Sequence, residues 1–416
     1  MSAPTTAAAD SGQVDRAASP SVESTAFVIR RWDDIAEADP GEWNAFLDPD
    51  DLQATHRFVQ ICQRSGIERA RYRHVMVCQA GKAVAIASLC AMDVRLEILT
   101  TSLVRSAIRR FRHWSPSLLR LPVAFAGLPV SFGRSCLRIR PRSDHRPLIA
   151  ILAAEIERWG AECGAGLLCA KEFAPEEASP LTGLVEHGFF RAPSLPFCTL
   201  PIRWRSFEEY LSAMRAGYRR QVLASLKVRE MLGLTVRTVE DFESQCVRIF
   251  PLYQQVMDRA PFQLERLNLD FFRLLASECR PAARAVLIER GRALLAAAIV
   301  LETPGAHTFL LAGLDYAQHR ETHSYINLVL ELITRAIEAG TSRLNLGQTS
   351  YDLKARLGAE VVPLELFLRH RSVWGHGLLR RASRVLFPAL SVPARRVFRS
   401  APQPPNLVAG PQPARL

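Results

Sequence analysis

Long apolar runs and paired cysteines are both missing from this sequence of 416 residues. No stretch of eighteen or more uncharged apolar residues occurs, so a membrane-spanning helix is not expected. The nine cysteines are scattered, without a CxxC pair or histidines at metal-ligand spacing. This pattern indicates reduced thiols in a core and argues against a bound metal. Residues 1–25 lack a basic segment followed by an apolar one, so we expect a disordered leader and a cytoplasmic protein.

Several catalytic and nucleotide-binding motifs are absent as well. There is no G-x-S-x-G elbow, and no histidine has a serine or cysteine partner at a recognisable spacing, which disfavours nucleophilic hydrolysis. No G-x-G-x-x-G follows an expected strand and no G-x-x-x-x-G-K-[ST] is present, which disfavours nucleotide binding by those loops. The sequence therefore favours a transfer reaction or a binding function.

The net positive charge of the chain comes from two windows. The formal net charge is +12, yet arginines without any acidic residue fill residues 98–143 and 366–416, and the rest of the chain is net acidic. Apolar residues alternate with the arginines in both windows. This alternation predicts contact with an anionic membrane surface. A solvated arginine-rich surface is the alternative, and binding to nucleic acid is less favoured.

The length suggests two domains, and an internal repeat supports that division. Residues 74–89 align with residues 285–300, and each segment is expected to form a hairpin. Each copy continues with a helix, a strand, a short helix that ends on glycine, and another apolar strand. Three pairs of glycines coincide: Gly81 with Gly291, Gly164 with Gly340, and Gly188 with Gly358. The repeated order predicts a duplicated α/β domain.

The expected fold is α/β (α+β), with mixed sheets flanked by helices in two tandem lobes. A single basic helix, Phe207 to Met231, is expected to open the second lobe. The predicted boundaries are a leader at 1–25, a first lobe with an arginine-rich insertion at 26–202, a second lobe at 203–372, and a basic amphipathic and proline-rich tail at 373–416.

A polar cluster follows an expected buried strand in residues 344–358, LNLGQTSYDLKARLG. Ligands usually bind at the carboxyl ends of strands in α/β sheets. Tyr351 and Lys354 are three positions apart, so they would share one face of a helix. A packing role for the tyrosine and a solvated lysine are the alternatives. The candidate substrate-binding residues are Asn345, Gln348 and Thr349 at the strand end, together with Lys354, which would pair with a phosphate or carboxylate.

Residues 310–360 resemble the end of the GNAT-fold acyltransferases of the FemAB and CelD-like branch. The matching positions are Gly313, Asp315, Tyr316, Ala336, Gly340, Tyr351, Lys354 and Gly358. The likeness covers residues 207–368 and implies two tandem GNAT-like domains, with the active cleft in the second. Asn345 stands where this branch often has an acidic residue.

The resemblance implies an N-acyltransferase that moves an acyl group from a thioester to an amine. Acyl-CoA or acetyl-CoA would be the co-substrate, and no metal would be needed. The acceptor would be a small-molecule or lipid-linked amine, for example one of cell-envelope or polysaccharide metabolism. In this chemistry His319 or His323 would take the proton of the amine, and Tyr351 would donate one to the leaving thiol.

The same resemblance places the cofactor pyrophosphate at a helix start. Residues 317–325 lack the usual glycine, so backbone amides near Ser324 and Tyr325, with Arg320, would hold the phosphates. Arg219 and Arg220 would form an anion-facing surface beside the cleft. The alternatives are a Fem-type peptidyl ligase that uses aminoacyl-tRNA, and an inactive protein that binds membrane or nucleic acid.

Overall fold

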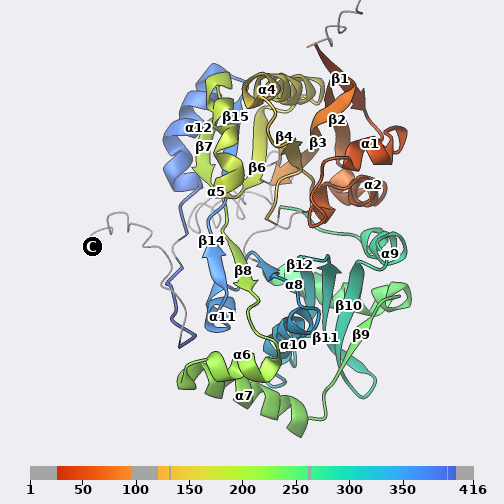
Figure 1. The fold of residues 1–416 in the computed structure, drawn as a ribbon, viewed down its shortest axis with the longest axis vertical. Helices are drawn as coiled ribbons and strands as arrows, with labels where there is room; N and C mark the ends of the chain where they lie inside the picture. Colours follow the sequence, from red (N-terminus) through yellow and green to blue (C-terminus); the bar gives the residue numbers. More distant parts are fainter. Residues whose placement is uncertain (1–25, 96–119, 131–132, 261–263, 391, 400–416) are drawn as a thin grey trace, which may run out of the picture.

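The computed structural model describes residues 26–95, 120–130, 133–260, 264–390 and 392–399, which form two stacked lobes (Figure 1). The expected leader, most of the first arginine window and the end of the tail lie outside the described residues. Among the residues described, no helix has the length and apolar content needed to cross a membrane.

The first lobe is built on a sheet of eight strands among the described residues, in the order β1-β2-β3-β4-β6-β15-β7, with β5 paired to β3. Strand β15 (Glu365–His370) comes from late in the chain. Its helix α4 carries the apolar residues Leu148, Leu152 and Ile156 at a spacing of four, and all three are buried against the sheet. The strands are β1 (Phe27–Trp32), β2 (Arg71–Gln79), β3 (Lys82–Arg95), β4 (Arg120–Ala126), β5 (Leu137–Ile139), β6 (Leu167–Phe173) and β7 (Phe190–Pro193). The helices are α1 (Pro40–Asn44), α2 (His56–Arg64), α4 (His145–Glu162) and α5 (Pro175–Ala178), with 3₁₀ segments at Ile35–Glu37, Leu52–Ala54, Ile67–Arg69 and Pro180–His187.

The second lobe contains seven described strands, in the order β14-β8-β13-β12-β11-β10-β9. Helix α10 buries a continuous stripe against this sheet, because its apolar residues recur in pairs every four positions. The strands are β8 (Phe197–Pro201), β9 (Thr235–Val239), β10 (Ala283–Arg290), β11 (Ala293–Glu302), β12 (Ala306–Leu314), β13 (Arg343–Gly347) and β14 (Glu360–Val362). The helices are α6 (Phe207–Ala213), α7 (Ala216–Met231), α8 (Cys246–Arg259), α9 (Leu269–Glu278), α10 (Ser324–Glu338) and α11 (Tyr351–Arg356), with a 3₁₀ segment at Glu243–Gln245.

The predicted duplication is confirmed by the topology. In each lobe a hairpin leads to a third strand, which pairs in parallel with the strand after the long helix, β4 with β6 and β12 with β13. All six glycines of the aligned pairs have left-handed φ angles between 59° and 91°. A residue with a Cβ adopts such angles at a cost, so the glycines recur because both copies need the same turns.

The two lobes exchange a strand, which differs from the predicted boundaries at 202 and 372. Strand β8 lies between β13 and β14 in the second sheet, and β15 (Glu365–His370) lies between β6 and β7 in the first. Each strand follows the edge strand of one lobe and then pairs across to the other. The proline-rich stretch 189–202 supplies the edge strand β7 to the first sheet and the internal strand β8 to the second.

The expected single helix from Phe207 to Met231 is two helices, α6 and α7. The chain is extended at Met214, with φ −69° and ψ 147°, and Met214 forms a β-bridge with Phe398. The backbone carbonyl of Val397 accepts a hydrogen bond from the amide of Arg215 at 2.8 Å. Part of the predicted tail therefore packs against the second lobe and holds the two helices apart.

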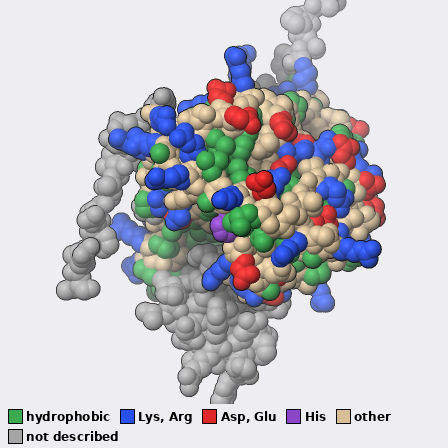
Figure 2. Space-filling model, turned by 90° about the horizontal axis from the view of Figure 1, so that it is seen from below, with side chains coloured by type: hydrophobic (Ala, Val, Ile, Leu, Met, Phe, Trp, Pro, Cys, Tyr) green, Lys and Arg blue, Asp and Glu red, His purple; other side chains and the backbone are tan. Residues whose placement is uncertain are grey.

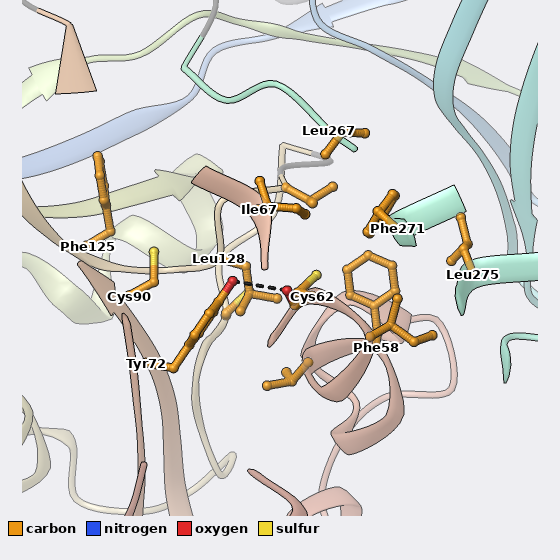
Figure 3. Close-up of a cluster of buried hydrophobic side chains, with 14 of the residues drawn as sticks. Phe58, Cys62, Ile67, Tyr72, Cys90, Phe125, Leu128, Leu267, Phe271 and Leu275 are labelled. Atoms are coloured by element: carbon orange, nitrogen blue, oxygen red, sulfur yellow. Dashed lines mark hydrogen bonds between the residues drawn. The ribbon is translucent and has the colours of Figure 1, made fainter. Parts of the chain in front are cut away.

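An apolar core joins the lobes where α2 of the first faces α9 of the second (Figure 3). The rings of Phe58 and Phe271 meet edge to face with centroids 6.4 Å apart. The hydroxyl of Tyr72 donates to the carbonyl of Cys62 at 3.2 Å, which satisfies a polar group inside this core. The lobes thus share one buried apolar interior.

Candidate active site

The strands β12 and β13 separate in the middle of the second sheet. They pair in parallel over three positions, the last being Thr308 with Asn345. Beyond that point β12 stays with β11, and β13 stays with β8. The amide nitrogen of Asn345 donates to the Thr308 hydroxyl at 3.1 Å, and the Asn345 oxygen accepts from Thr199 at 3.4 Å. The predicted cleft residue Asn345 is therefore buried where the strands begin to diverge.

A pocket of about 430 Å³ lies between α7, the start of α10 and α11. Figure 2 shows the molecule from below, the side of α6 and α7, where a histidine lies among apolar and basic side chains. The pocket contains three of the predicted site residues, His319, His323 and Tyr325. Its lining residues are Tyr218, Gln221, Val222, Ala224, Ser225, His319, His323, Tyr325, Ile326, Leu353, Arg356 and Leu357.

The start of α10 presents unused hydrogen-bond donors at this pocket. His323 precedes the helix with a left-handed φ of 50° and provides no side-chain cap. Among the described residues, the backbone amides of Tyr325 and Ile326 have no acceptor. The hydroxyl of Ser324 is fully buried and has no hydrogen-bond partner in the part of the chain that the structure describes. Free amides at a helix N-terminus favour an anion, because the helix dipole adds positive potential there.

The two histidines differ in their surroundings. Nδ1 of His323 lies 3.0 Å from the Ser225 hydroxyl, which fixes the ring against α7. The His319 ring packs edge to face on Tyr316, with centroids 4.7 Å apart, and its nitrogens make no hydrogen bond to any described residue. Partial burial, together with the charges of Arg320 and Arg259, lowers the pKa of His319. A neutral imidazole with free nitrogens can accept a proton.

Two other residues predicted to bind the cofactor lie at the same helix start. Burial raises the pKa of Tyr325 to about 12, although a hydrogen bond with the Ser350 side chain opposes the shift. Tyr325 therefore stays protonated at neutral pH and can donate. Arg320 is exposed, and its charge acts on His319 nearby.

Tyr351 and Lys354 share the inner side of α11, but they make contacts inside the lobe and do not line the pocket. The Tyr351 hydroxyl donates to the carbonyl of Pro196 at 2.9 Å. The Lys354 ammonium, only 2% exposed, donates to the carbonyls of Gln348 at 2.7 Å and Gly347 at 3.4 Å. Burial raises the pKa of Tyr351 to about 12 and lowers the pKa of Lys354 to about 8.

The other residues of the polar turn hold it in place or face solvent. Gln348 donates from its side chain to the carbonyl of Leu195 at 3.0 Å, which ties the turn to the chain just before β8. Thr349 and Ser350 are exposed and have left-handed φ angles of 64° and 50°. Such angles are costly for residues with a Cβ, so the surrounding contacts must over-determine this turn.

Helix α7 lines the pocket with residues other than those predicted. Arg219 is half-buried and Arg220 is exposed, and neither borders the pocket. Ala224 and Ser225, on the same helix, do border it. Two small residues in the middle of a basic amphipathic helix allow another element to approach closely. This pair was the sequence feature that could have indicated the pocket.

Within the described ranges, no group of three or more histidine, cysteine or acidic side chains is placed to hold a metal ion. All nine cysteines are free thiols, and eight of them are buried. Cys198 on β8 pairs with Gly347 at the beginning of the polar turn. Burial raises the pKa of its thiol, so the thiol stays protonated. The groups available for chemistry are therefore the histidines, the tyrosines and the backbone amides.

The comparisons with known proteins agree with this geometry. Residues 212–355 match the model of the acetyltransferase (GNAT) domain, and this segment includes the diverging strands and the start of α10. The fold is similar to that of FemX, with 13% identity, a TM-score of 0.52, and coverage of 79% of this chain and 95% of FemX. The second lobe thus contains an acetyltransferase (GNAT) domain. The expected pair of tandem GNAT-like domains is confirmed.

Two other solved structures resemble this chain at a TM-score of 0.49 and 12% identity. One is a tandem GNAT protein from the clavulanic acid biosynthesis pathway, with coverage of 83% of this chain and 99% of that one. The other is L-PGS from Bacillus licheniformis, with coverage of 84% and 98%. A search of curated protein sequences finds no match.

Proposed function

We propose that the second lobe transfers an acyl group from acyl-CoA or acetyl-CoA to an amine. The observation that carries this proposal is the pocket at the start of α10, where two backbone amides have no acceptor among the described residues. The amides of Tyr325 and Ile326 would bind the pyrophosphate, with Arg320 adding positive charge at the rim. The thioester would enter the opening between the strands.

The chemistry requires three proton or charge adjustments. The amine nitrogen bonds to the thioester carbonyl carbon, and a backbone amide stabilises the oxyanion that forms. We propose that His319 takes the proton of the attacking amine, because its nitrogens are free and its lowered pKa keeps it neutral. The carbon–sulfur bond then breaks, and the thiolate takes up a proton as CoA leaves. His323 would shape the donor site from its fixed position against Ser225.

The acceptor in this proposal is an uncharged amine on a small molecule or a lipid-linked precursor. Arg219 and Arg220 lie on α7, the helix that borders the pocket, and would attract an acceptor that also carries anionic groups. The residues at the end of β13 would act by holding the divergence point open. Asn345 does so directly, because it bonds to the strands on either side.

The test is thermal unfolding of the full chain with acetyl-CoA and with longer acyl-CoAs. A bound donor should raise the melting temperature in proportion to the logarithm of its concentration. Ala224→Trp, which fills the pocket, should abolish the shift, whereas Ala216→Trp at the exposed start of α7 should retain it. Absence of stabilisation by every acyl-CoA would contradict the proposal. Stabilisation by aminoacyl-tRNA alone would replace it with the Fem-type reaction.

A further inference from the structure

Helix α12 (Val373–Leu386) exposes a stripe of apolar residues on the outer side of the first lobe (Figure 1). Trp374 is 90% exposed, Leu378 70% and Val385 62%. These positions are spaced by four and seven residues, so they lie on one face of the helix. Arg381 occupies the intervening position of the same stripe. Large apolar side chains are seldom so exposed in a row, and such a stripe marks a contact surface.

The opposite face of α12 is firmly attached to the protein. Leu379 packs against the first-lobe core, and the His376 ring meets Phe190 edge to face with centroids 5.5 Å apart. The Ser372 side chain caps the helix by accepting from the amide of Gly375. The helix is therefore held in one orientation, and its outward stripe has a fixed direction.

The charged side chains of α12 and of Arg371 just before it are all positive, and none forms an ion pair with a described residue. Helix α12 contains no acidic residue. Arg371, Arg380, Arg381 and Arg384 are exposed, and none of them forms an ion pair with a described residue. Elsewhere in the described chain many arginines form ion pairs. One of them is Arg369 on β15, which pairs with Glu157 on α4. The free guanidinium groups thus remain available for phosphates.

We propose that the outer face of α12 docks the protein on an anionic phospholipid surface. Trp374, Leu378 and Val385 would enter the headgroup boundary, and the arginines would bind lipid phosphates from either side. A helix lying in the plane of the interface has this combination of an apolar stripe, an aromatic residue and flanking basic side chains. A protein partner with an acidic face would pair the arginines but would leave Trp374 poorly matched.

This docking goes beyond the proposed reaction and does not depend on the acyl donor. It would place the enzyme at a membrane surface, where a lipid-linked acceptor is concentrated. The first arginine window was expected to act in the same way, and its residues 98–119 lie outside the described residues. Helix α12 carries the proposal alone.

The test is flotation of the full chain with vesicles of phosphatidylcholine alone and with phosphatidylglycerol added. We expect co-flotation with the anionic vesicles that falls as salt is raised. The triple variant W374S/L378S/V385S should lower the bound fraction at least tenfold, and so should R380Q/R381Q/R384Q. The matched control L223S/M231S/V247S removes three exposed apolar residues from the second lobe and should bind like the wild type.

Circular dichroism would verify that the exposed substitutions leave the fold intact. Wild-type protein that does not float with anionic vesicles would overturn the proposal, and so would undiminished binding by W374S/L378S/V385S. Self-association that this variant abolishes, without vesicle binding, would also overturn it, because the face would then join two copies of the chain.

Discussion

The carboxylate of Asp50 lies 2.9 Å from Nη2 of Arg343, and this ion pair joins the first lobe to the start of β13 in the second. The other carboxylate oxygen of Asp50 accepts from the Thr303 hydroxyl at 2.7 Å and from the amide of Gly305 at 3.0 Å. A Cβ on Gly305 would come within 2.3 Å of this carboxylate. One side chain thus fixes the β11–β12 turn and the strand that leads to the active site.

Replacing Asp50 should destabilise the protein strongly. Asp50→Ala leaves the Arg343 guanidinium and the Gly305 amide without this acceptor, whereas the Thr303 hydroxyl can still donate to the Ala306 carbonyl. We therefore expect a loss of about 2 to 3 kcal/mol in the free energy of unfolding. Urea denaturation would measure it. Glu186→Gln breaks an exposed pair with Arg146 at 3.8 Å and should cost no more than about 0.5 kcal/mol. Equal midpoints for the two variants would refute the prediction.

The strand exchange makes a second prediction about which fragments fold. Fragment 195–363 contains all seven described strands of the second sheet. Fragment 203–372 lacks β8, which would leave β13 and β14 with unpaired backbone groups, and it carries β15 without a partner. We expect only the first fragment to unfold cooperatively and to resist protease. The same behaviour in both would show that the exchanged strand is dispensable.

The duplication could be predicted from the sequence because both copies need glycine at the same left-handed turns, and the matching glycines can be aligned. The sheet that β8 and β15 each join could not be predicted, because both are short apolar strands that follow similar turns. Their alternation of side chains specifies a buried face but not the sheet they join. The break at Met214 was hidden for a similar reason, since its cause is the contact with Phe398, far along the chain.

The candidate site was predicted in part. The histidines and the helix start were located because the resemblance placed the phosphate site there. The sequence predicted the polar cluster after β13, but not that Tyr351 and Lys354 point into the lobe. Both side chains donate to backbone carbonyls, and no sequence pattern reveals those acceptors. Hydrogen bonds from side chain to backbone depend on tertiary placement, so their acceptors cannot be predicted from spacing.

Tyr351→Phe should separate the packing role from the catalytic one. The variant loses the hydrogen bond to Pro196, so we expect the free energy of unfolding to fall by about 1 kcal/mol. If the hydroxyl only fastens α11 to the chain before β8, kcat should stay within about threefold of the wild type. A fall in kcat of more than about tenfold would restore Tyr351 as the proton donor to the leaving thiol. Steady-state kinetics and chemical denaturation on the same preparation give both numbers.

His319→Asn should lower kcat by a factor of about 100 or more if His319 is the general base. The pKa of His319 lies below its usual value of about 6.5, so the wild-type kcat should fall only as the pH drops below that value. This acid limb should be absent from the variant. His323→Asn should keep the limb and change mainly the KM for the donor, because His323 borders the donor site. An acid limb that survives in His319→Asn would assign the base elsewhere.

Lys354 should make the stability of the protein rise with pH in the alkaline range. Burial lowers the pKa of Lys354 to about 8, whereas an unfolded lysine has a pKa of about 10.4. Between these values the unfolded chain binds more protons, so the free energy of unfolding increases with pH, by about 2 kcal/mol from pH 7.5 to 9.5. Lys354→Met removes this term, and the difference between variant and wild type cancels the opposing contributions of buried cysteines and tyrosines. Lys227→Met, at an exposed position on α7, should retain the wild-type dependence. Parallel curves for Lys354→Met and the wild type would show that the Lys354 ammonium is not desolvated in the folded protein.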